Sequence, residues 1–500
     1  QHLRPDAIAC NAAISAAGTG QQWSSCLRLL EEMRVAGLEP SAVSFCAAAS
    51  GCEKAGTWDF MLELLGGMQC RGLRQPSIGY SVAILGCVHA GRWRKGLQLL
   101  DETEARGLDP DMDSYSLLLM ASEQRTALPA ELSLLRRLPA AARAAAALGA
   151  AAAIAAAVRL LASGSVAQAR VLLREAEERW GTSSVSALLL ASAGERRSLP
   201  LPPHQRMSFA PAEVVPAGSP YAKELSLLRH AMETATPGDP ASVSEAVEHF
   251  GKDAEARPAA SMWLKVAGGT KEEVLTFATR AGPAGGGVLE VGAYCGYSSI
   301  RIAIANPGVH IATIDVDPVH VVIARNMHAL AGLSQSADVW TGHARDVLPE
   351  LSARYGGPGQ PRLSAVFMDQ RGSRYSEDLA ALERQGHLCR GAVVVADNVL
   401  KPGAPLFLWR LLGDRACGAT AAYEAQVVSL QEFLMPAEDW MSVSVRRTLA
   451  PSAFDEELSQ PPGAILAQEA AAERIRERVQ NPGRSVTFSQ WAAFSREMRA

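Results

Sequence analysis

The chain has few aromatic residues, little net charge and no paired cysteine motif, and each shortage excludes a class of protein. Aromatic residues make up 6% of the 500 residues, and 48 Lys and Arg stand against 52 Asp and Glu, which gives a net charge of −4. This balance argues against a protein that wraps nucleic acid or an anionic membrane over its whole surface. The nine cysteines include no Cys-x-x-Cys pair. That argues against a zinc ribbon or a disulfide framework and suits a reducing intracellular compartment.

A long apolar run is also missing. The longest, 144–158, consists mostly of alanine, whereas a membrane span needs about 20 strongly apolar residues. We therefore expect a buried helix there and no membrane partner. The chain begins with Gln1 inside a repeat, so we expect a fragment whose targeting segment would lie upstream. Cytoplasm and an organelle both stay open as compartments.

The first 122 residues repeat with a period of 35. At this shift three tryptophans and three glycines align, namely Trp23, Trp58, Trp93, Gly37, Gly72 and Gly107. Such a period is typical of solenoids, in which each unit buries its apolar face against its neighbours. Each unit has two apolar stretches around a short turn, and a glycine follows where a helix C-cap is expected. The pattern predicts an all-α solenoid of helix-turn-helix repeats over residues 1–122.

These repeats resemble the pentatricopeptide repeat family, because they end in EEMRVAGLEP, GGMQCRGLRQP and DETEARGLDP. The family reads single-stranded RNA through two positions in each unit. The resemblance places these positions at Asn11 with Ser41, Cys46 with Pro76, and Ser81 with Asp111. Residues 1–122 hold ten Lys or Arg and thirteen Asp or Glu, whereas an RNA-binding face usually has a positive excess. Single-stranded RNA and a protein both stay open as partners, and the charge favours a protein.

The rest of the chain divides by composition. Residues 123–198 are rich in alanine and leucine without the 35-residue register, which predicts a degenerate helical region. Six prolines within 199–220 predict an interdomain linker, because proline removes backbone donors and ends helices. A catalytic domain is expected at 221–449. Residues 450–500 form a tail in which a helix is expected near 468–479.

Alternating strand and helix patterns over 221–449 predict an α/β doubly wound, parallel, Rossmann-like sheet with its ligand at the carboxyl ends of the strands. The expected strands cover 287–292, 310–316, 364–368 and 392–396. Gly292 lets the backbone approach a ligand closely, and Asp315 ends the next strand, where a carboxylate commonly binds ribose hydroxyls. The loop lacks the glycine spacing of a pyrophosphate site, so it favours S-adenosylmethionine over a dinucleotide.

Oxygen-bearing side chains follow the last two expected strands, at Asp369 and at Asp397 with Asn398. Each acid alone could cap a following helix. Hard oxygen ligands that converge at one edge of a sheet suit Mg²⁺. Their place beside a nucleoside loop favours the metal over the cap.

The segments VLEVGAYCGYSS, ATIDVDP, TGHARDVLPEL and VVVADNVLKPGAP resemble the catechol O-methyltransferase family, from about residue 222 to about residue 445. The resemblance implies an S-adenosylmethionine- and Mg²⁺-dependent O-methyltransferase that acts on catechol-type vicinal diols. It implies metal ligands at Asp369, Asp397 and Asn398, and a catalytic acid at Glu432 that accepts the second catechol hydroxyl. It implies cofactor contacts at Ala267, Glu290, Gly292, Tyr294, Ser298, Asp315, Gly342, His343, Ala344, Asp369 and Gln370.

One departure from the family concerns its base. The family has Asp-His-Trp-Lys-Asp-Arg-Tyr after the fourth strand, and its lysine deprotonates the reacting hydroxyl. Here Gly372 stands where the lysine belongs. Lys401, a few residues after Asp397, is the candidate replacement, with a solvated loop lysine as the alternative. Three functions stay open: an active O-methyltransferase, an RNA-binding repeat protein with a passenger domain, and a decayed methyltransferase that binds cofactor without turnover.

Overall fold

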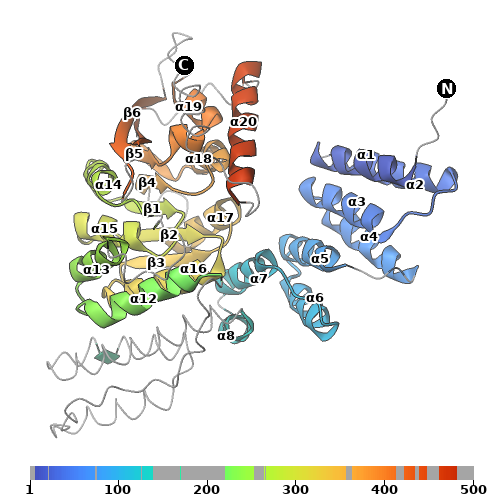
Figure 1. Ribbon diagram of the computed structural model, residues 1–500, viewed down its shortest axis with the longest axis horizontal. Coiled ribbons are helices and arrows are strands. Elements are labelled where there is room, and N and C mark those ends of the chain that lie inside the picture. The colour runs from blue at the N-terminus through green and yellow to red at the C-terminus, as the bar shows by residue number, and fades with distance from the viewer. Residues whose placement is uncertain are drawn as a thin grey trace, which may run out of the picture. The chain divides into compact units, whose positions relative to one another are not determined.

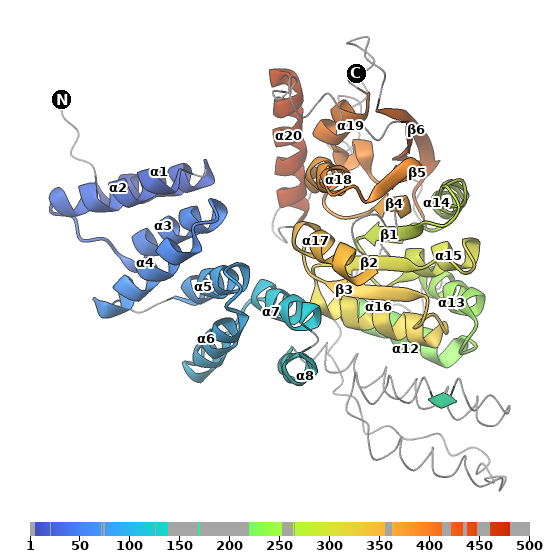
Figure 2. The same cartoon turned by 180° about the vertical axis from the view of Figure 1, so that it is seen from behind.

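A computed structural model of the chain describes residues 6–20, 22–71, 73, 76–125, 127–138, 169–170, 220–252, 264, 266–355, 363–412, 422–433, 438–447 and 461–480. The chain divides into two compact units, Gln1–Leu134 and Leu135–Ala500. Most of the alanine-rich region and nearly all of the proline-rich linker predicted from the sequence lie outside the described residues. Figures 1 and 2 show the helices and strands of each unit from opposite sides.

The N-terminal unit consists of successive helix pairs. They are α1 (Ala7–Thr19) with α2 (Trp23–Val35), α3 (Ala42–Lys54) with α4 (Trp58–Cys70), and α5 (Ser77–His89) with α6 (Trp93–Ala105), followed by α7 (Met112–Gln124) and α8 (Leu128–Arg137). Each aligned tryptophan begins the second helix of its pair. Asp6, Ser41 and Asp111 cap the first helices, since each side chain accepts a backbone N–H bond three residues later. The predicted helix-turn-helix solenoid is confirmed.

The repeats bury their apolar faces against one another. Ile14, Leu30 and Ala48 join α1, α2 and α3 in one buried cluster. Cys46 is buried in the next cluster with Met68 of α4. Cys46 therefore belongs to the core, and Ser41 and Asp111 serve as helix caps, although the resemblance assigned all three to RNA contact.

The C-terminal unit contains a mixed sheet in the order β3-β2-β1-β4-β5-β7-β6. Its strands are β1 (Gly287–Val291), β2 (Ile311–Asp315), β3 (Ala337–Thr341), β4 (Leu363–Met368), β5 (Leu388–Ala396), β6 (Tyr423–Gln431) and β7 (Glu438–Arg446). The first five strands pair in parallel, and β7 pairs antiparallel with both β5 and β6. The doubly wound sheet is confirmed: the four strands expected from the sequence pair in parallel, and the antiparallel strands β6 and β7 were not among them. The half-buried edge strand β6 lacks the continuous apolar run that marks buried parallel strands.

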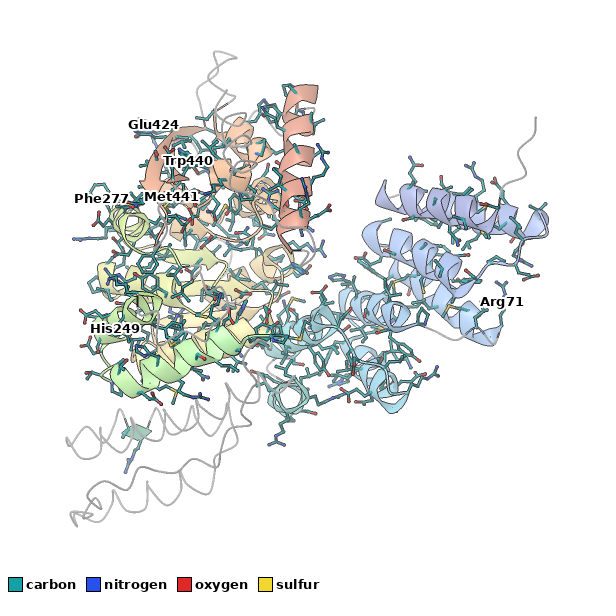
Figure 3. All side chains as sticks on the ribbon, viewed as in Figure 1. Arg71, His249, Phe277, Glu424, Trp440 and Met441 are labelled. Atoms are coloured by element: carbon teal, nitrogen blue, oxygen red, sulfur yellow. The ribbon has the colours of Figure 1, made fainter. Side chains whose placement is uncertain are left out.

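Helices cover both faces of this sheet, as Figures 1 and 2 show. One layer contains α12 (Ala222–Thr234), α13 (Pro240–Lys252), α14 (Thr270–Arg280), α15 (Tyr297–Ala305) and α16 (Pro318–Leu330), and the other contains α17 (Ala344–Tyr355), α18 (Tyr375–Arg384) and α19 (Pro405–Leu412). Leu275 of α14, Phe367 of β4 and Met441 of β7 share one buried cluster. Figure 3 shows Phe277 on the outer side of α14, where it is 78% exposed.

A last helix, α20 (Gly463–Gln480), contains the stretch that the sequence predicted as helical and packs on α19 and on η2 (Val399–Gly403). It thereby reaches the loop that follows β5. Across the described ranges, no helix has both the length and the apolar composition needed to cross a membrane.

Candidate active site

The candidate site lies where the parallel strands end. Backbone hydrogen bonds continue the ladder just beyond them: the Asp369 N–H donates to the Val291 carbonyl at 2.8 Å, and the Asp397 N–H donates to the Met368 carbonyl at 3.0 Å. Because β2, β1, β4 and β5 are neighbours in the sheet, their following loops share one edge, where doubly wound folds bind ligands. We call the loops that follow β1, β2 and β3 the cofactor half. We call the loops that follow β4 and β5, together with the start of β7, the acceptor half.

Gly292 begins the loop after β1 and lies so close to the Asp369 backbone that no side chain fits at this position. Its φ is +106°, and a Cβ atom there would lie 2.4 Å from the Asp369 carbonyl oxygen. Only glycine combines this conformation with such a close approach. The neighbour that requires glycine here is the Asp369 backbone, and the close approach of a ligand to Gly292 stays a prediction.

Asp315 faces the same loop from the end of β2. Its Oδ2 accepts the Tyr294 N–H at 2.8 Å, and its Oδ1 accepts the Asp317 N–H at 2.8 Å. The Tyr294 hydroxyl donates to Glu224 Oε1 of α12 at 2.7 Å. Burial alone would lower the pKa of His320, but hydrogen bonding and charge from Asp315 raise it. The carboxylate is thus held by backbone donors in one orientation, as a ribose-binding acid requires.

Glu290 lies beneath this loop on β1 and is fully buried. Burial raises its pKa to about 7, although hydrogen bonds from Ser298 and Thr313 oppose the rise. The Thr313 hydroxyl donates to Glu290 Oε2 at 2.5 Å. Ser298 is nearly buried in the first turn of α15, and Ala267 is buried in the sheet core.

The residues predicted at the adenine end follow β3. The Gly342 N–H donates to the Asp315 carbonyl at 2.9 Å. The His343 carbonyl accepts the Asp346 and Val347 N–H groups and so initiates α17, in which Ala344 is buried. Through the Gly342 hydrogen bond, the loop after β3 lies beside Asp315 at the end of β2. It is the last segment of the cofactor half.

The acceptor half is built around a lysine that sequence reasoning missed. Lys271 of α14 is 2% exposed, and its Nζ lies 2.9 Å from Asp397 Oδ2, 3.0 Å from Glu432 Oε2 and 2.8 Å from Asp439 Oδ2. We call these three carboxylates the acid cluster. Lys271, Leu275 and Ala278 share the buried face of α14, and a lysine on an apolar helical stripe is the one signal that could have identified it.

Burial and charge oppose each other in the acid cluster. Burial alone would lower the pKa of Lys271, but the carboxylates of Asp397, Asp439 and Glu432 raise it above its usual value. Burial and a hydrogen bond with Asp439 raise the pKa of Glu432 to about 8. Burial and the neighbouring Asp397 raise the pKa of Asp369 well above its usual range. The acceptor half therefore holds an excess of acids around one permanent cation.

The predicted metal ligands lie at this edge, and both carboxylate oxygens of Asp397 already have hydrogen-bond partners. Asp397 Oδ1 accepts the Asn398 N–H at 2.8 Å, and its Oδ2 accepts from Lys271. Asn398 Nδ2 donates to Asp439 Oδ2 at 2.5 Å. In the part of the chain that the structure describes, no group of three or more His, Cys, Asp or Glu is arranged to hold a metal ion. With the Lys271 ammonium on its Oδ2, the Asp397 carboxylate does not fit Mg²⁺ in this arrangement, and dependence on Mg²⁺ stays a prediction from the sequence.

Arg476 fills the space at the position of the family's lysine. A Cβ atom on Gly372, in the short helix η1 (Gly372–Arg374), would lie 2.8 Å from Arg476 Nη2. The Arg476 side chain is nearly buried, donates to the Gly403 carbonyl and pairs with Glu473 at 3.0 Å. Arg371 pairs with Glu473 as well. The C-terminal helix, for which the sequence suggested no role, thus covers this loop.

The remaining predicted residues lie around the same edge. Gln370 Nε2 donates to Asp378 Oδ2 at 2.8 Å, and burial raises the pKa of Asp378 to about 6. Lys401 Nζ lies 3.5 Å from the Glu438 carbonyl, at the start of β7. Glu432 belongs to the acid cluster, where its Oε2 accepts a hydrogen bond from Lys271 Nζ at 3.0 Å.

Comparisons with known proteins place two families on this chain. Residues 247–406 match the family model described as O-methyltransferase, and residues 78–108 match that of the PPR repeat. Catechol O-methyltransferase of Mus musculus is 35% identical over 199 residues, which cover 40% of this chain and 71% of the mouse protein. The Bos taurus enzyme is 34% identical over 194 residues, 39% of this chain and 67% of that protein. The O-methyltransferase TomG from Streptomyces achromogenes, solved with SAM, is 21% identical over 41% of this chain and 90% of that chain, with a TM-score of 0.32.

Proposed function

This chain belongs to the catechol O-methyltransferase family, and we propose that its C-terminal unit transfers the methyl group of S-adenosylmethionine to one hydroxyl of a catechol-type small molecule. The observation that supports this most is the cofactor half, in which the bare backbone of Gly292 lies beside the backbone-held carboxylate of Asp315. That pairing suits a nucleoside without a diphosphate.

Each half of the site has a distinct task in this proposal. Asp315 accepts hydrogen bonds from the ribose hydroxyls of the cofactor, and the loop after β3 lies against its adenine ring. Glu432 accepts a hydrogen bond from the acceptor diol, which is the role that the resemblance to the family implies for it. Lys401 stays the sequence-based candidate for the group that takes the proton of the reacting hydroxyl. The catalytic gain would come from holding the hydroxyl oxygen in line with the methyl group.

Cofactor binding by the full chain tests this proposal. Isothermal titration with S-adenosylmethionine should show binding by the wild type, and Asp315→Ala should weaken it by about 1.5–3 kcal/mol through lost charge-assisted hydrogen bonds. Asp338→Ala is the matched control, since Asp338 lies on β3 and contacts His310 instead. Radiolabelled methyl transfer to catechol then tests turnover. A wild type that binds no cofactor would refute the proposal, and one that binds it without transfer would favour the decayed enzyme.

The N-terminal unit has a separate candidate function in binding a partner. Ile8, Val43 and Ile78 are the second residues of α1, α3 and α5, and they are 78%, 63% and 64% exposed. We infer that this apolar row contacts a protein, because the unit lacks the positive charge that single-stranded RNA requires. Fluorescence anisotropy of labelled single-stranded RNA with the full chain should show no salt-sensitive binding. Salt-sensitive binding of that RNA would reverse the choice of partner.

A further inference from the structure

A single side chain, Lys271, connects all three carboxylates of the acid cluster. An ammonium group has three N–H donors and no acceptor, and Lys271 directs one hydrogen bond to each of Asp397, Glu432 and Asp439. All four side chains are at most 7% exposed. A buried ammonium is tolerated when its carboxylate partners and hydrogen bonds repay the lost hydration. Lys271 therefore has no donor left for a substrate, and its contacts are those of a bound cation.

The position of this ammonium bears on the metal that the family implies. Asp397 belongs both to the acid cluster and to the predicted metal ligands, and its Oδ2 lies 2.9 Å from Lys271 Nζ. Mg²⁺ demands near-ideal octahedral geometry at about 2.0–2.1 Å from its oxygens. A divalent ion on this carboxylate would lie close to a like charge in a buried setting, where such repulsion is weakly screened. Lys271 is also in the first turn of α14, and helix N-termini add positive potential.

The same ammonium joins segments that are distant in the sequence. Asp397 follows β5, Glu432 follows β6 and Asp439 lies on β7. Asn398 Nδ2 adds a bond to Asp439, and the Tyr375 hydroxyl donates to the Asp397 carbonyl at 3.0 Å. Removing Lys271 would free three carboxylates at once, and hard oxygen ligands in that number suit a divalent cation.

We propose that the Lys271 ammonium is the resident cation of the acid cluster and that it excludes a divalent metal ion from Asp397. It follows, on the proposed methyltransferase function, that methyl transfer by this chain is independent of divalent metal. Lys271 acts through Asp397 and Glu432, so it is a positioning residue. The binding part of the proposal holds whether or not the chain turns over.

Binding of Mn²⁺ to the full chain, followed by electron paramagnetic resonance, tests the proposal without reference to activity. We expect no saturable binding by the wild type or by Lys271→Arg. Lys271→Met should bind Mn²⁺ at least about tenfold more tightly, because the positive charge that repels the metal ion has been removed from beside Asp397. Lys252→Met removes an exposed lysine of α13 that pairs with Glu248, and as the matched control it should behave like the wild type.

Two outcomes would overturn the proposal. One is saturable Mn²⁺ binding by the wild type that Asp397→Asn removes. The other is a folded Lys271→Met protein that binds no Mn²⁺. If that variant does not fold, the double variant Lys271→Met with Asp439→Asn removes one acid as well, and the same criterion applies to it.

Activity separates this proposal from the proposed function. The wild type should methylate catechol at the same rate in excess EDTA and in excess Mg²⁺. A rate that EDTA abolishes would refute the role of Lys271 and leave the methyltransferase function standing. No transfer under either condition, with the expected Mn²⁺ pattern, would refute the function and leave the cation assignment standing.

Discussion

The two halves of the site differ in how closely they follow the family pattern. In the cofactor half, Gly292 packs against the Asp369 backbone and Asp315 accepts the Tyr294 N–H, at the positions where the family pattern predicts them. In the acceptor half, Lys271 occupies the centre of the acids and Arg476 covers the position of the family's base. On the proposed function, the cofactor half contacts only the cofactor and would suit any methyl acceptor. The acceptor half contacts the methyl acceptor, so we expect differences in substrate or in cation requirement to arise from its residues.

The strongest test of the cofactor half is Gly292→Ala. The new Cβ atom would lie 2.4 Å from the Asp369 carbonyl oxygen, at a φ of +106°. Because the obstacle is backbone, the two loops must separate, and we expect cofactor binding to be lost by about 100-fold or more, beyond the roughly 1–3 kcal/mol of backbone strain alone. Titration calorimetry with S-adenosylmethionine measures it.

Gly285→Ala is the control for this change. Gly285 has a φ of +85°, but nothing lies within 4 Å of its added Cβ atom. It should therefore cost stability and leave the affinity for the cofactor unchanged. Equal affinities for both variants would show that Gly292 is not close to the cofactor.

The matching test of the acceptor half is the stability of Lys271→Met. This change leaves three buried carboxylates without their cation, and removing one partner of a buried ion pair costs about 3–5 kcal/mol. Urea unfolding near neutral pH should show that loss. Lys252→Met should lie within about 0.5 kcal/mol of the wild type, as exposed pairs do. A small effect of Lys271→Met would mean that the acids do not depend on this ammonium.

Sequence reasoning identified neighbouring residues where the contacts are local. Gly292, Tyr294 and Asp315 fall within one strand–helix–strand stretch, so their pattern can be read directly. The apolar runs of β1, β2, β4 and β5 likewise predicted the centre of the sheet, because strands buried on both faces are continuously apolar. The half-buried edge strand β6 has no such signal.

It failed where the contacts are distant. Lys271 meets Asp439 across 168 residues, and Arg476 meets Gly403 across 73. Neither pair belongs to a motif, and a lysine near the start of a helix is typical of a solvated surface. Only the fold brings these side chains to one edge of the sheet, so the apolar stripe of α14 could mark Lys271 as buried but could not identify its partners.

Glu290 offers a smaller effect that belongs to the cofactor half. Burial raises its pKa from 4.5 to about 7, so the folded protein holds this proton more tightly than the unfolded chain does. Its contribution to stability is fully present below the unfolded pKa and is lost as the pH rises through about 7. Glu290→Gln has no proton to lose, so between about pH 5 and pH 8 it should gain about 3 kcal/mol relative to the wild type.

Urea unfolding at both ends of this range measures the gain. Glu350→Gln, on the exposed side of α17, is the control and should follow the wild type at both pH values. If Glu290→Gln also follows the wild type, Glu290 is ionised at the lower pH and the hydrogen bonds from Ser298 and Thr313 outweigh its burial.

The smallest effect is expected where the family's base would be restored. In Gly372→Lys, the new side chain meets Arg476 Nη2 at 2.8 Å and the Gly403 carbonyl at 3.2 Å, and it sets two cations side by side. We therefore expect its rate with catechol to stay within about twofold of the wild type, despite the roughly 10²–10⁴-fold that a positioned base supplies. Adding Arg476→Ala frees the space, so the double variant should gain about tenfold near neutral pH. Arg476→Ala alone shows what uncovering the loop contributes. A full gain from Gly372→Lys alone would mean that α20 leaves this loop open in solution. Lys401→Ala completes the set, because loss of most activity would make Lys401 the proton acceptor and the acceptor half would then have its own base opposite the family's position.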